Sequence, residues 1–342
     1  MPATGPTFIP RGLVFPQPVI CEGMDMYSFL IRGTRQNLQA LCDVYLNNPS
    51  NGAVQYRPMS AVVTITITDT KKIRSADPVY SQMGYVPERE AAFWVNVENA
   101  KSPGDDVSFF MPFLYVDRAI ALSAGREIFG FAKEYGVCRM PTDPGANGNL
   151  GVDVWAIEEY GPDSFPQKKP LVAFAPIEQS FLQKMEQTIV SGVEALAGFI
   201  RDLAIPSERD AELATLVEAF KTIANMEKPQ FQMVLLKQFR DVEDGVLACY
   251  QAIVTAPTMA QKVVSLKLLP NFAVTVNQYA SHPIIDQLGL QLTNGTTKTI
   301  MATHFSGDTT LGNGTVVWEA ATSRLKSSVA DPTEAVSPKT PT

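Results

Sequence analysis

The chain is poor in the residues that build metal and disulfide sites. Its four cysteines are far apart in the sequence and form no Cys-x-x-Cys pair, so neither a disulfide framework nor a zinc cluster is expected. There are only two histidines, His282 and His304, and neither sits near a cysteine or a clear acidic cluster. A histidine-rich metal site is therefore excluded, and we expect a structural role for each histidine.

Basic charge and long hydrophobic runs are also scarce. Lysine and arginine number 28 against 35 aspartates and glutamates, which gives a net charge of −7. Such a chain has no basic footprint for nucleic acid or for an anionic membrane. No apolar stretch approaches the ~20 residues that span a bilayer, and no basic segment followed by an apolar run marks a secretory signal. We expect a cytoplasmic protein without nucleic-acid or membrane partners.

Hydrophobic content, by contrast, is ample. The 342 residues are 45% hydrophobic and 18% charged, which is typical of a globular protein with a low surface charge. A chain of this length buries a large core, in one large domain or in two small ones.

Alternating apolar residues predict many short strands. The segment Ala61–Thr68 alternates branched apolar residues with threonine, and every second residue of Ala91–Val97 is apolar. Val107–Val116 is a more continuous apolar run, typical of a buried strand. Further strands are predicted at 152–156, 171–174, 231–238, 246–254, 263–269, 274–279, 299–305 and 315–320. Short strands separated by turns indicate a sheet sandwich or a closed barrel.

Two regions have helical periodicity. Apolar residues between Thr34 and Tyr45 share one helical face, and the block 178–225 contains two helical stretches interrupted at Pro206. Elsewhere, the first dozen residues predict an extended arm and 144–148 predicts a turn. The tail 326–342, rich in serine, proline and threonine, predicts disorder.

The segment Gly125–Lys133 carries the most specific chemistry. It reads Gly-Arg-Glu-Ile-Phe-Gly-Phe-Ala-Lys, so Lys133 directly follows a nearly uncharged run of aromatic and small residues. An apolar environment disfavours the ammonium ion and lowers the lysine pKa, and a neutral amine attacks a ketone or aldehyde to form a Schiff base. The alternative is an ordinary lysine whose stem lies along an apolar surface while its charge reaches water.

The same segment resembles the lysine motif of the acetoacetate decarboxylase superfamily, which reads roughly Gly-Arg-Glu, three residues, an aromatic residue, proline and lysine. The match extends upstream through Tyr115-Val116-Asp117 and through 84–97, where Glu88 falls on the family's active-site glutamate. The run Phe8-Ile9-Pro10-Arg11-Gly12 is similar to the family's opening Phe-Pro-Arg-Gly, and 229–255 is similar to its late pair of strands.

The resemblance implies one α+β domain over residues 1–325. Its core is expected to be a mixed, mostly antiparallel, barrel-like sheet with peripheral helices and a helical-hairpin insertion at 178–227. It also implies a lyase without a cofactor, because the covalent imine forms on Lys133 itself, and a small carbonyl-containing substrate as partner. The low surface charge and the apolar insertion further predict a homo-oligomer.

The family pattern assigns roles to four residues around the motif. Lys133 is the expected nucleophile, and Glu88 is the expected acid and base that moves protons during imine formation. The alternative for Glu88 is a surface carboxylate in a turn. Arg126 and Glu127 are expected to form a buried ion pair that fixes the lysine loop.

Three further residues are candidate substrate contacts. Phe131 is expected to keep water away from the lysine, and Tyr85 is either a pocket hydroxyl or a packing residue. Met24 aligns with an arginine of the decarboxylases, and Thr64 or Thr66 replaces a second pocket glutamate.

These departures change the expected reaction. Glu134 stands where the decarboxylases have a second lysine, and a nearby carboxylate would oppose activation of Lys133. Loss of the arginine at Met24 favours the branch that resembles aldolase-dehydratases, which condense a 2-oxo acid with an aldehyde and then lose water. The prediction is a Schiff-base lyase that acts on a small keto acid, 2-oxo acid or aldehyde. The alternatives are a true acetoacetate-type decarboxylase and a non-catalytic barrel that binds a small ligand.

Overall fold

The structure is a computed structural model that describes residues 9, 15–102, 107–141, 150–177, 211–226 and 229–321. Several predicted features lie outside these residues. They are the N-terminal arm apart from Ile9, the turn at 144–148, the first helical stretch of the 178–225 block and the tail 326–342.

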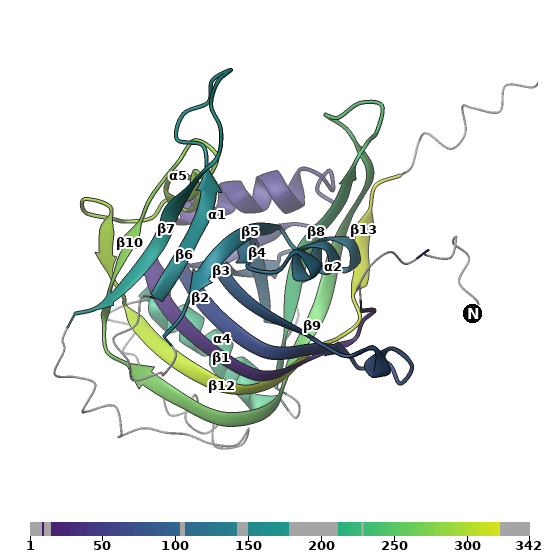
Figure 1. Ribbon diagram of the computed structural model, residues 1–342, viewed down its shortest axis with the longest axis horizontal. Helices are drawn as coiled ribbons and strands as arrows, with labels where there is room; N and C mark the ends of the chain where they lie inside the picture. The colour runs from purple at the N-terminus through teal and green to yellow at the C-terminus, as the bar shows by residue number, and fades with distance from the viewer. Residues whose placement is uncertain are drawn as a thin grey trace, which may run out of the picture.

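Strands make up most of the described chain (Figure 1). They are β1 (Val19–Arg32), β2 (Tyr56–Ser75), β3 (Val86–Asn99), β4 (Ser108–Val116), β5 (Lys133–Arg139), β6 (Leu150–Ala156), β7 (Gln167–Pro176), β8 (Gln230–Arg240), β9 (Ala248–Leu269), β10 (Phe272–Val276), β11 (Thr296–Lys298), β12 (Met301–Leu311) and β13 (Thr315–Glu319). The helices are α1 (Arg35–Cys42), α2 (Ala119–Ile128), α4 (Ala211–Asn225) and α5 (Ile284–Leu288). A π-helical turn, η1 (Asp43–Asn47), follows α1, and η2 (Tyr80–Met83) is a 3-10 turn before β3.

The strand pairings form a closed circuit. Antiparallel pairs run from β4 through β3, β2, β1, β12 and β9 to β8, and β8 pairs with β4 in parallel. A second run, β5, β6, β7, β10 and β11, continues from β4 through its parallel pair with β5. The predicted mostly antiparallel β core is therefore confirmed, and its closure depends on the parallel pair β4–β8.

Strands β1, β2 and β3 are covered on both faces. One face of each carries large apolar residues, such as Phe29, Ile65 and Phe93, which pack into the main core together with residues of α1, β6, β7, β10 and α5. Because side chains alternate along a strand, the opposite face points into the space within the circuit. This explains the alternation in Ala61–Thr68, where Val63, Ile65 and Ile67 belong to the core and Thr64 and Thr66 line a cavity.

Most predicted strands are present, but the set of predicted strands needs correction. The segments 246–254 and 263–269 belong to one long strand, β9, because the less apolar stretch between them also pairs with β8 and β12. Strands β5 and β11 have no counterpart among the predictions, and neither has β1. Its cavity face carries Cys21, Met24 and Ser28, so neither the apolar alternation nor the branched residues typical of strands stand out.

The described helices pack against the sheet, α1 and α5 in the main core and α2 and α4 next to the space within the circuit. The hydroxyl of Thr34 caps α1 by accepting a hydrogen bond from the Asn37 backbone, as expected for an N-cap threonine. Helix α4 is the predicted second helix of the 178–225 block. Its Leu213 and Leu216 pack with Val62 of β2, so this part of the insertion is held by its own chain. The hairpin itself stays a prediction because its first half lies outside the described residues.

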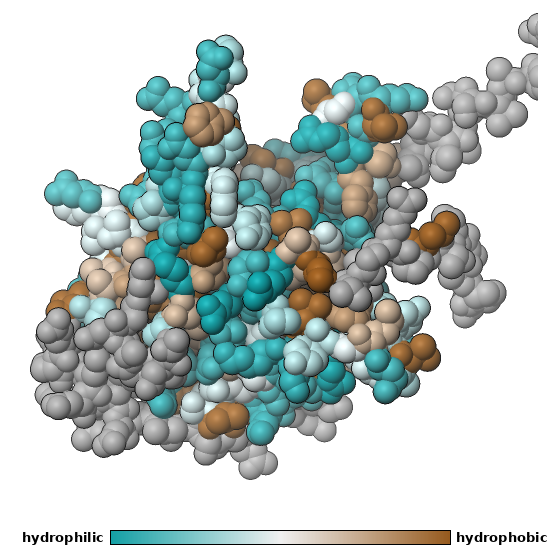
Figure 2. All heavy atoms as spheres, in the orientation of Figure 1, coloured by the Kyte–Doolittle hydropathy of each residue, from teal (hydrophilic) through white to brown (hydrophobic). Residues whose placement is uncertain are grey.

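The described surface is mainly hydrophilic in the view of Figure 2. Hydrophobic side chains are scattered there, and some gather at the tip of the β8–β9 hairpin, where Val242 and Val246 are almost fully exposed. Within the described part of the chain, no helix is long and apolar enough to cross a membrane.

Candidate active site

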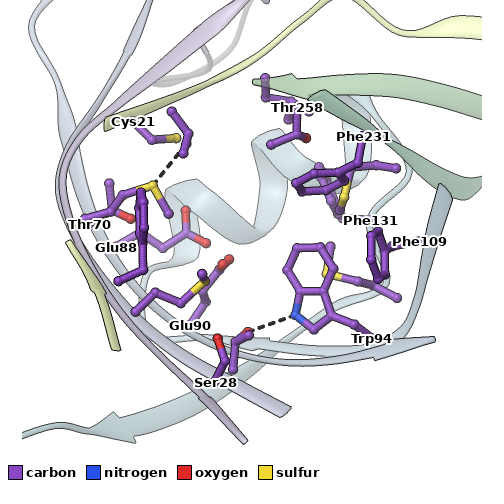
Figure 3. A pocket seen from close by; sticks show the side chains of 18 of the residues that line it. Cys21, Ser28, Thr70, Glu88, Glu90, Trp94, Phe109, Phe131, Phe231 and Thr258 are labelled. Carbon is purple, nitrogen blue, oxygen red and sulfur yellow. Dashed lines mark hydrogen bonds between the residues drawn. The ribbon is translucent and has the colours of Figure 1, made fainter. Parts of the chain in front are cut away.

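The circuit of strands encloses a cavity of about 430 Å³. All seven strands of the circuit contribute to its lining, and α2 and α4 also contact it. Most of the lining side chains are apolar, and the charged ones gather on one wall (Figure 3). The cavity is the candidate site for a reactive group, because a few polar side chains converge there within apolar surroundings.

Lys133 reaches this cavity from the start of β5. Helix α2 ends at Ile128, and the backbone N–H groups of Phe129, Gly130 and Phe131 all donate to the carbonyl of Gly125. A Cβ on Gly125 would lie 2.7 Å from Cδ of Lys133 and 2.8 Å from its Cε. The glycine of the motif is therefore needed so that the helix can lie against the lysine stem.

Two glutamates of β3 meet the lysine amine. Glu88 Oε1 lies 2.6 Å from Lys133 Nζ, and both side chains are more than nine-tenths buried. Glu90, two residues further along β3, lines the same cavity and hydrogen-bonds the Glu88 carboxyl. Residues two apart on a strand share a face, so the same alternation that points Glu88 inward also points Glu90 inward. Glu90 was absent from the sequence-based candidates.

Burial and the neighbouring charges set the protonation of this cluster. Desolvation, followed by the charge of Glu88, raises the pKa of Glu90 to about 7. Burial alone would lower the pKa of Lys133, but the charges of Glu88 and Glu90 outweigh it, so the net direction is upward. The prediction of an amine made neutral by desolvation is therefore wrong for the free protein. The raised pKa favours the ammonium form of Lys133, which lies against the Glu88 carboxyl group.

Phe131 and Met24 both line the cavity. The Phe131 ring is 8% exposed, its centroid is 5.6 Å from Lys133 Nζ, and it packs against Phe129. Met24 lines the cavity from β1, and its sulfur accepts a hydrogen bond from the Thr309 hydroxyl at 3.0 Å. Both positions agree with a lining role. Thr64 and Thr66 also line the cavity, and the Thr66 hydroxyl accepts from Trp94 Nε1 at 2.8 Å.

Tyr85 lies outside the cavity. Its side chain is 54% exposed, and its ring lies 5.1 Å from the ammonium group of Lys72. Residues three apart along an extended chain point to opposite faces, so Tyr85 cannot share the inward direction of Glu88. The hypothesis that Tyr85 supplies a pocket hydroxyl is therefore wrong.

Arg126 and Glu127 do not form the expected buried ion pair. Both residues are exposed on α2. Gly125 lies on the buried face of this helix, and the two residues after it in the sequence lie on the face toward solvent. Arg126 still stabilises the motif, since its guanidinium donates to the carbonyl of Lys133 at 3.0 Å. Arg126 therefore contacts the backbone of the lysine segment, whereas Glu127 makes no ion pair with it.

Glu134 and Arg89 also point away from the lysine amine. Glu134 follows Lys133 on β5 and therefore takes the opposite face, where it is 57% exposed and lies 3.4 Å from His282. Arg89 lies between Glu88 and Glu90 on β3, and its guanidinium donates to Asp69 at 3.1 Å. Neither side chain lines the cavity. Lys133 is the one cationic residue among the described residues that line it.

The sequence-based reading also missed the aromatic wall opposite the glutamates. Trp94, Phe109 and Phe231 pack edge to face, with ring centroids 5.3–6.1 Å apart. They come from β3, β4 and β8, so only the closure of the circuit brings them together. Figure 3 shows these rings facing Glu88 and Glu90 across the cavity.

The remaining reactive side chains are less suited to chemistry in the cavity. Cys21 lines the cavity, but burial and then the charges of Glu88 and Glu90 raise the pKa of its thiol to about 12. A thiol that stays protonated is a poor nucleophile. His282 and His304 are buried and line other parts of the core. Within the described residues, no three histidine, cysteine, aspartate or glutamate side chains are grouped as metal ligands would be.

Replacing Glu90 with glutamine should change how stability depends on pH. The folded protein holds a proton on Glu90 between the ordinary glutamate pKa of 4.5 and about 7, whereas the unfolded chain has released it. Folding therefore takes up a proton in this window, so the wild type loses stability as the pH rises through it. Between pH 5 and pH 8, the free energy of unfolding should fall by on the order of 3 kcal/mol less in Glu90→Gln than in the wild type. Urea unfolding at the two pH values measures this difference.

The matched control for this experiment is Glu127→Gln, which alters an exposed glutamate of α2. It should leave the wild-type pH dependence unchanged. Parallel pH profiles for the wild type and Glu90→Gln would contradict the raised pKa of Glu90.

Comparison with solved structures identifies proteins of the same fold. The chain is similar to acetoacetate decarboxylase from Legionella pneumophila, at 15% identity and a TM-score of 0.56 over 93% of each chain. It is also similar to an acetoacetate decarboxylase-like enzyme from Sphingomonas wittichii RW1, at 12% identity and a TM-score of 0.50 over 93% of this chain and 100% of the other. A further acetoacetate decarboxylase structure matches at 12% identity and a TM-score of 0.50, over 90% of this chain and 92% of that chain.

The sequence itself matches no protein-family model and no curated protein. At such low identities the structural likeness concerns the fold, and it confirms the predicted acetoacetate decarboxylase-like fold.

Proposed function

We propose that the protein is a Schiff-base-forming lyase that uses Lys133 as its nucleophile. The observation that carries this proposal is the buried contact of 2.6 Å between Lys133 Nζ and Glu88 Oε1 at the wall of a mostly apolar cavity. A buried ion pair contributes little net stability, because desolvation costs about as much as the pairing returns. A chemical role accounts better for an ammonium and two carboxylates at one cavity wall.

The cluster holds the proton donors and acceptors that imine formation requires. Lys133 is protonated at rest, so Glu88 must first accept a proton across their hydrogen bond. The neutral amine then adds to the carbonyl carbon. The nitrogen, now positively charged, releases one proton and the former carbonyl oxygen takes one up, which gives the neutral carbinolamine. A second proton lets that oxygen leave as water and gives the iminium ion. Glu90, which carries a proton below about pH 7, is placed to supply one of these protons.

The lining favours addition, aldol and dehydration chemistry over loss of carbon dioxide. An iminium on Lys133 accepts electrons from the adjacent carbon, which supports the removal of a proton there and the formation or cleavage of a carbon–carbon bond. Decarboxylation needs in addition a cation that holds the substrate carboxylate. No arginine and no second lysine is among the described residues that line the cavity. A true acetoacetate-type decarboxylase is therefore the second candidate.

Trapping of the imine tests the proposal. The protein is incubated with pyruvate, acetoacetate or acetone in the presence of cyanoborohydride, and labelled peptides are identified by mass spectrometry. We expect the reduced adduct on the peptide that contains Lys133, and no adduct at that position in Lys133→Met. The rival is Lys237, whose pKa is lowered by burial and whose ammonium donates to the Ile128 carbonyl outside the cavity.

Labelling confined to Lys237 would show that a lowered pKa decides reactivity and that the cavity has no Schiff-base role. Absence of any adduct would favour the third candidate, a non-catalytic fold that binds a small ligand.

A further inference from the structure

The cavity continues well beyond the cluster of Lys133, Glu88 and Glu90. Its remaining lining is mostly apolar and comes from strands far apart in the sequence. Representative side chains are Trp94, Phe109, Met111, Phe231, Leu266 and Met301. The volume of about 430 Å³ lies in the range of ~300–1,000 Å³ typical of pockets for drug-sized ligands. A carbonyl compound of three or four carbon atoms would leave most of this space and its apolar walls unused.

The charges at the reactive wall disfavour an anionic substrate. The one ammonium among the described lining residues is already paired with Glu88, and Glu90 brings a second carboxyl group. A substrate carboxylate in this cavity would lose its hydration without gaining a free cation. The hydroxyl groups that line the cavity, such as Thr66, offer hydrogen bonds but no compensating charge.

The aromatic wall offers a defined place for an apolar chain. Trp94, Phe109 and Phe231 face the glutamates across the cavity (Figure 3). The Trp94 indole is fixed by its hydrogen bond to Thr66, and Phe109 also stacks on Phe220 of α4 at a centroid distance of 6.1 Å. A substrate bound by Lys133 would therefore extend toward a preformed apolar surface.

Building on the proposed Schiff-base function, we propose that the substrate is a neutral ketone or aldehyde with a long apolar tail. Its carbonyl carbon lies at Lys133, and its tail lies against Trp94, Phe109 and Phe231. The carbonyl end is thereby distinguished from the tail because Lys133, Glu88 and Glu90 are the charged side chains of the described lining.

A series of methyl ketones tests the substrate class on the intact protein. Acetone, 2-heptanone and 2-undecanone are trapped on Lys133 with cyanoborohydride, and the concentration that gives half-maximal labelling is compared. Burial of one methylene should lower that concentration about fourfold, until the cavity is filled. We expect 2-heptanone to label at a concentration at least a hundredfold lower than acetone, and 6-oxoheptanoate, which carries a carboxylate on its tail, to label far more weakly than 2-heptanone.

Equal half-maximal concentrations for acetone and 2-undecanone would overturn the proposal and leave the Schiff-base function intact. Labelling by 6-oxoheptanoate at a lower half-maximal concentration than 2-heptanone would overturn it as well, because a cation would then have to bind the carboxylate on the tail.

A second measurement separates this proposal from the Schiff-base function. The alcohols 2-butanol, 2-heptanol and 2-undecanol cannot form an imine, but their tails should bind to the same wall and change the fluorescence of Trp94, with Trp94→Phe as the control. Binding that strengthens with tail length would support the apolar site even if no ketone labels Lys133. The absence of any dependence on tail length would overturn it.

A cavity-filling substitution localises the tail. Ser28 lines the cavity on β1 and pairs in register with Thr66, which bonds Trp94. Ser28→Leu should reduce labelling by 2-undecanone more than labelling by acetone, whereas Ser28→Ala should change neither. Equal effects of Ser28→Leu on both ketones, in a variant with an unchanged circular dichroism spectrum, would place the tail elsewhere and overturn the proposed position.

Discussion

Replacing Glu88 with glutamine should slow turnover at Lys133 about a hundredfold or more. The substitution keeps the size and a hydrogen-bonding group but removes the acceptor that takes the proton from Lys133 across 2.6 Å. Without that acceptor, the amine is not freed at the moment of attack, and the carbinolamine loses a donor for its departing oxygen.

An opposing effect has to be weighed. Glu88 is one of the charges that raise the pKa of Lys133, so its removal favours the neutral amine. Glu90 limits this gain, because its own pKa is raised partly by the charge of Glu88. When that charge is gone, Glu90 ionises more readily and stabilises the ammonium in its place. We therefore expect the loss of proton transfer to dominate near neutral pH.

The rate can be followed without knowledge of the natural substrate. A ketone that forms an iminium on Lys133 exchanges the protons on its α-carbons with solvent, so deuterium uptake by 2-heptanone or acetone in D₂O is measured by proton NMR. Glu134→Gln is the matched control, because Glu134 adjoins Lys133 in sequence but is exposed on the opposite face. Wild-type exchange in Glu88→Gln would return Glu88 to a structural role.

The sequence permitted a correct prediction of the β core because its strands carry the local pattern that burial requires. The alternation in 61–68 and 91–97 predicts strands within β2 and β3, and both are present. Strand β1 was not predicted because its cavity face carries cysteine, methionine and serine rather than the branched residues typical of strands. The threonines on the cavity face of β2 reveal its period, whereas the methionines and the cysteine on the cavity face of β1 do not contrast with its core face.

The candidate site was predictable only in part. The resemblance supplied Lys133 and Glu88, and the structure places them in contact. Glu90 could have been found from Glu88 alone, because residues two apart on a strand share a face. The same rule excludes Tyr85 and Glu134 from the cavity. The aromatic wall could not have been found in full, because Phe231 meets Trp94 and Phe109 only through the pairing of β4 with β8.

The residues next to Lys133 in the sequence also led to a wrong prediction of the direction of its pKa shift. The run before Lys133 is apolar, and from the chain alone desolvation seems the dominant influence. The structure adds two carboxyl groups from β3, which are 45 and 43 positions away in the sequence, and they reverse the direction of the pKa shift. The protonation of a buried group thus depends on long-range contacts that a linear motif does not contain.

The protein should be a poor acetoacetate decarboxylase, with a release of carbon dioxide at least a hundredfold below the ~10 s⁻¹ of a typical enzyme. Decarboxylation through an iminium needs the substrate carboxylate to be held and then lost as neutral carbon dioxide. Met24, for which the family resemblance predicted the position of the decarboxylase arginine, lines the cavity with an uncharged thioether, and Arg89 is turned toward Asp69. An uncharged side chain cannot hold a carboxylate as an arginine does.

Direct measurement of carbon dioxide from acetoacetate checks this expectation, with imine trapping on the same sample as the positive control for an active lysine. The gain-of-function variant is Met24→Arg combined with Glu90→Gln, since an arginine introduced alone would be neutralised by the carboxylates already in the cavity. We expect this double variant to release carbon dioxide faster than the matched control Met24→Leu with Glu90→Gln. A rate of ~10 s⁻¹ or more in the wild type would show that a cation outside the described lining serves the carboxylate, and the argument from Met24 would then be wrong.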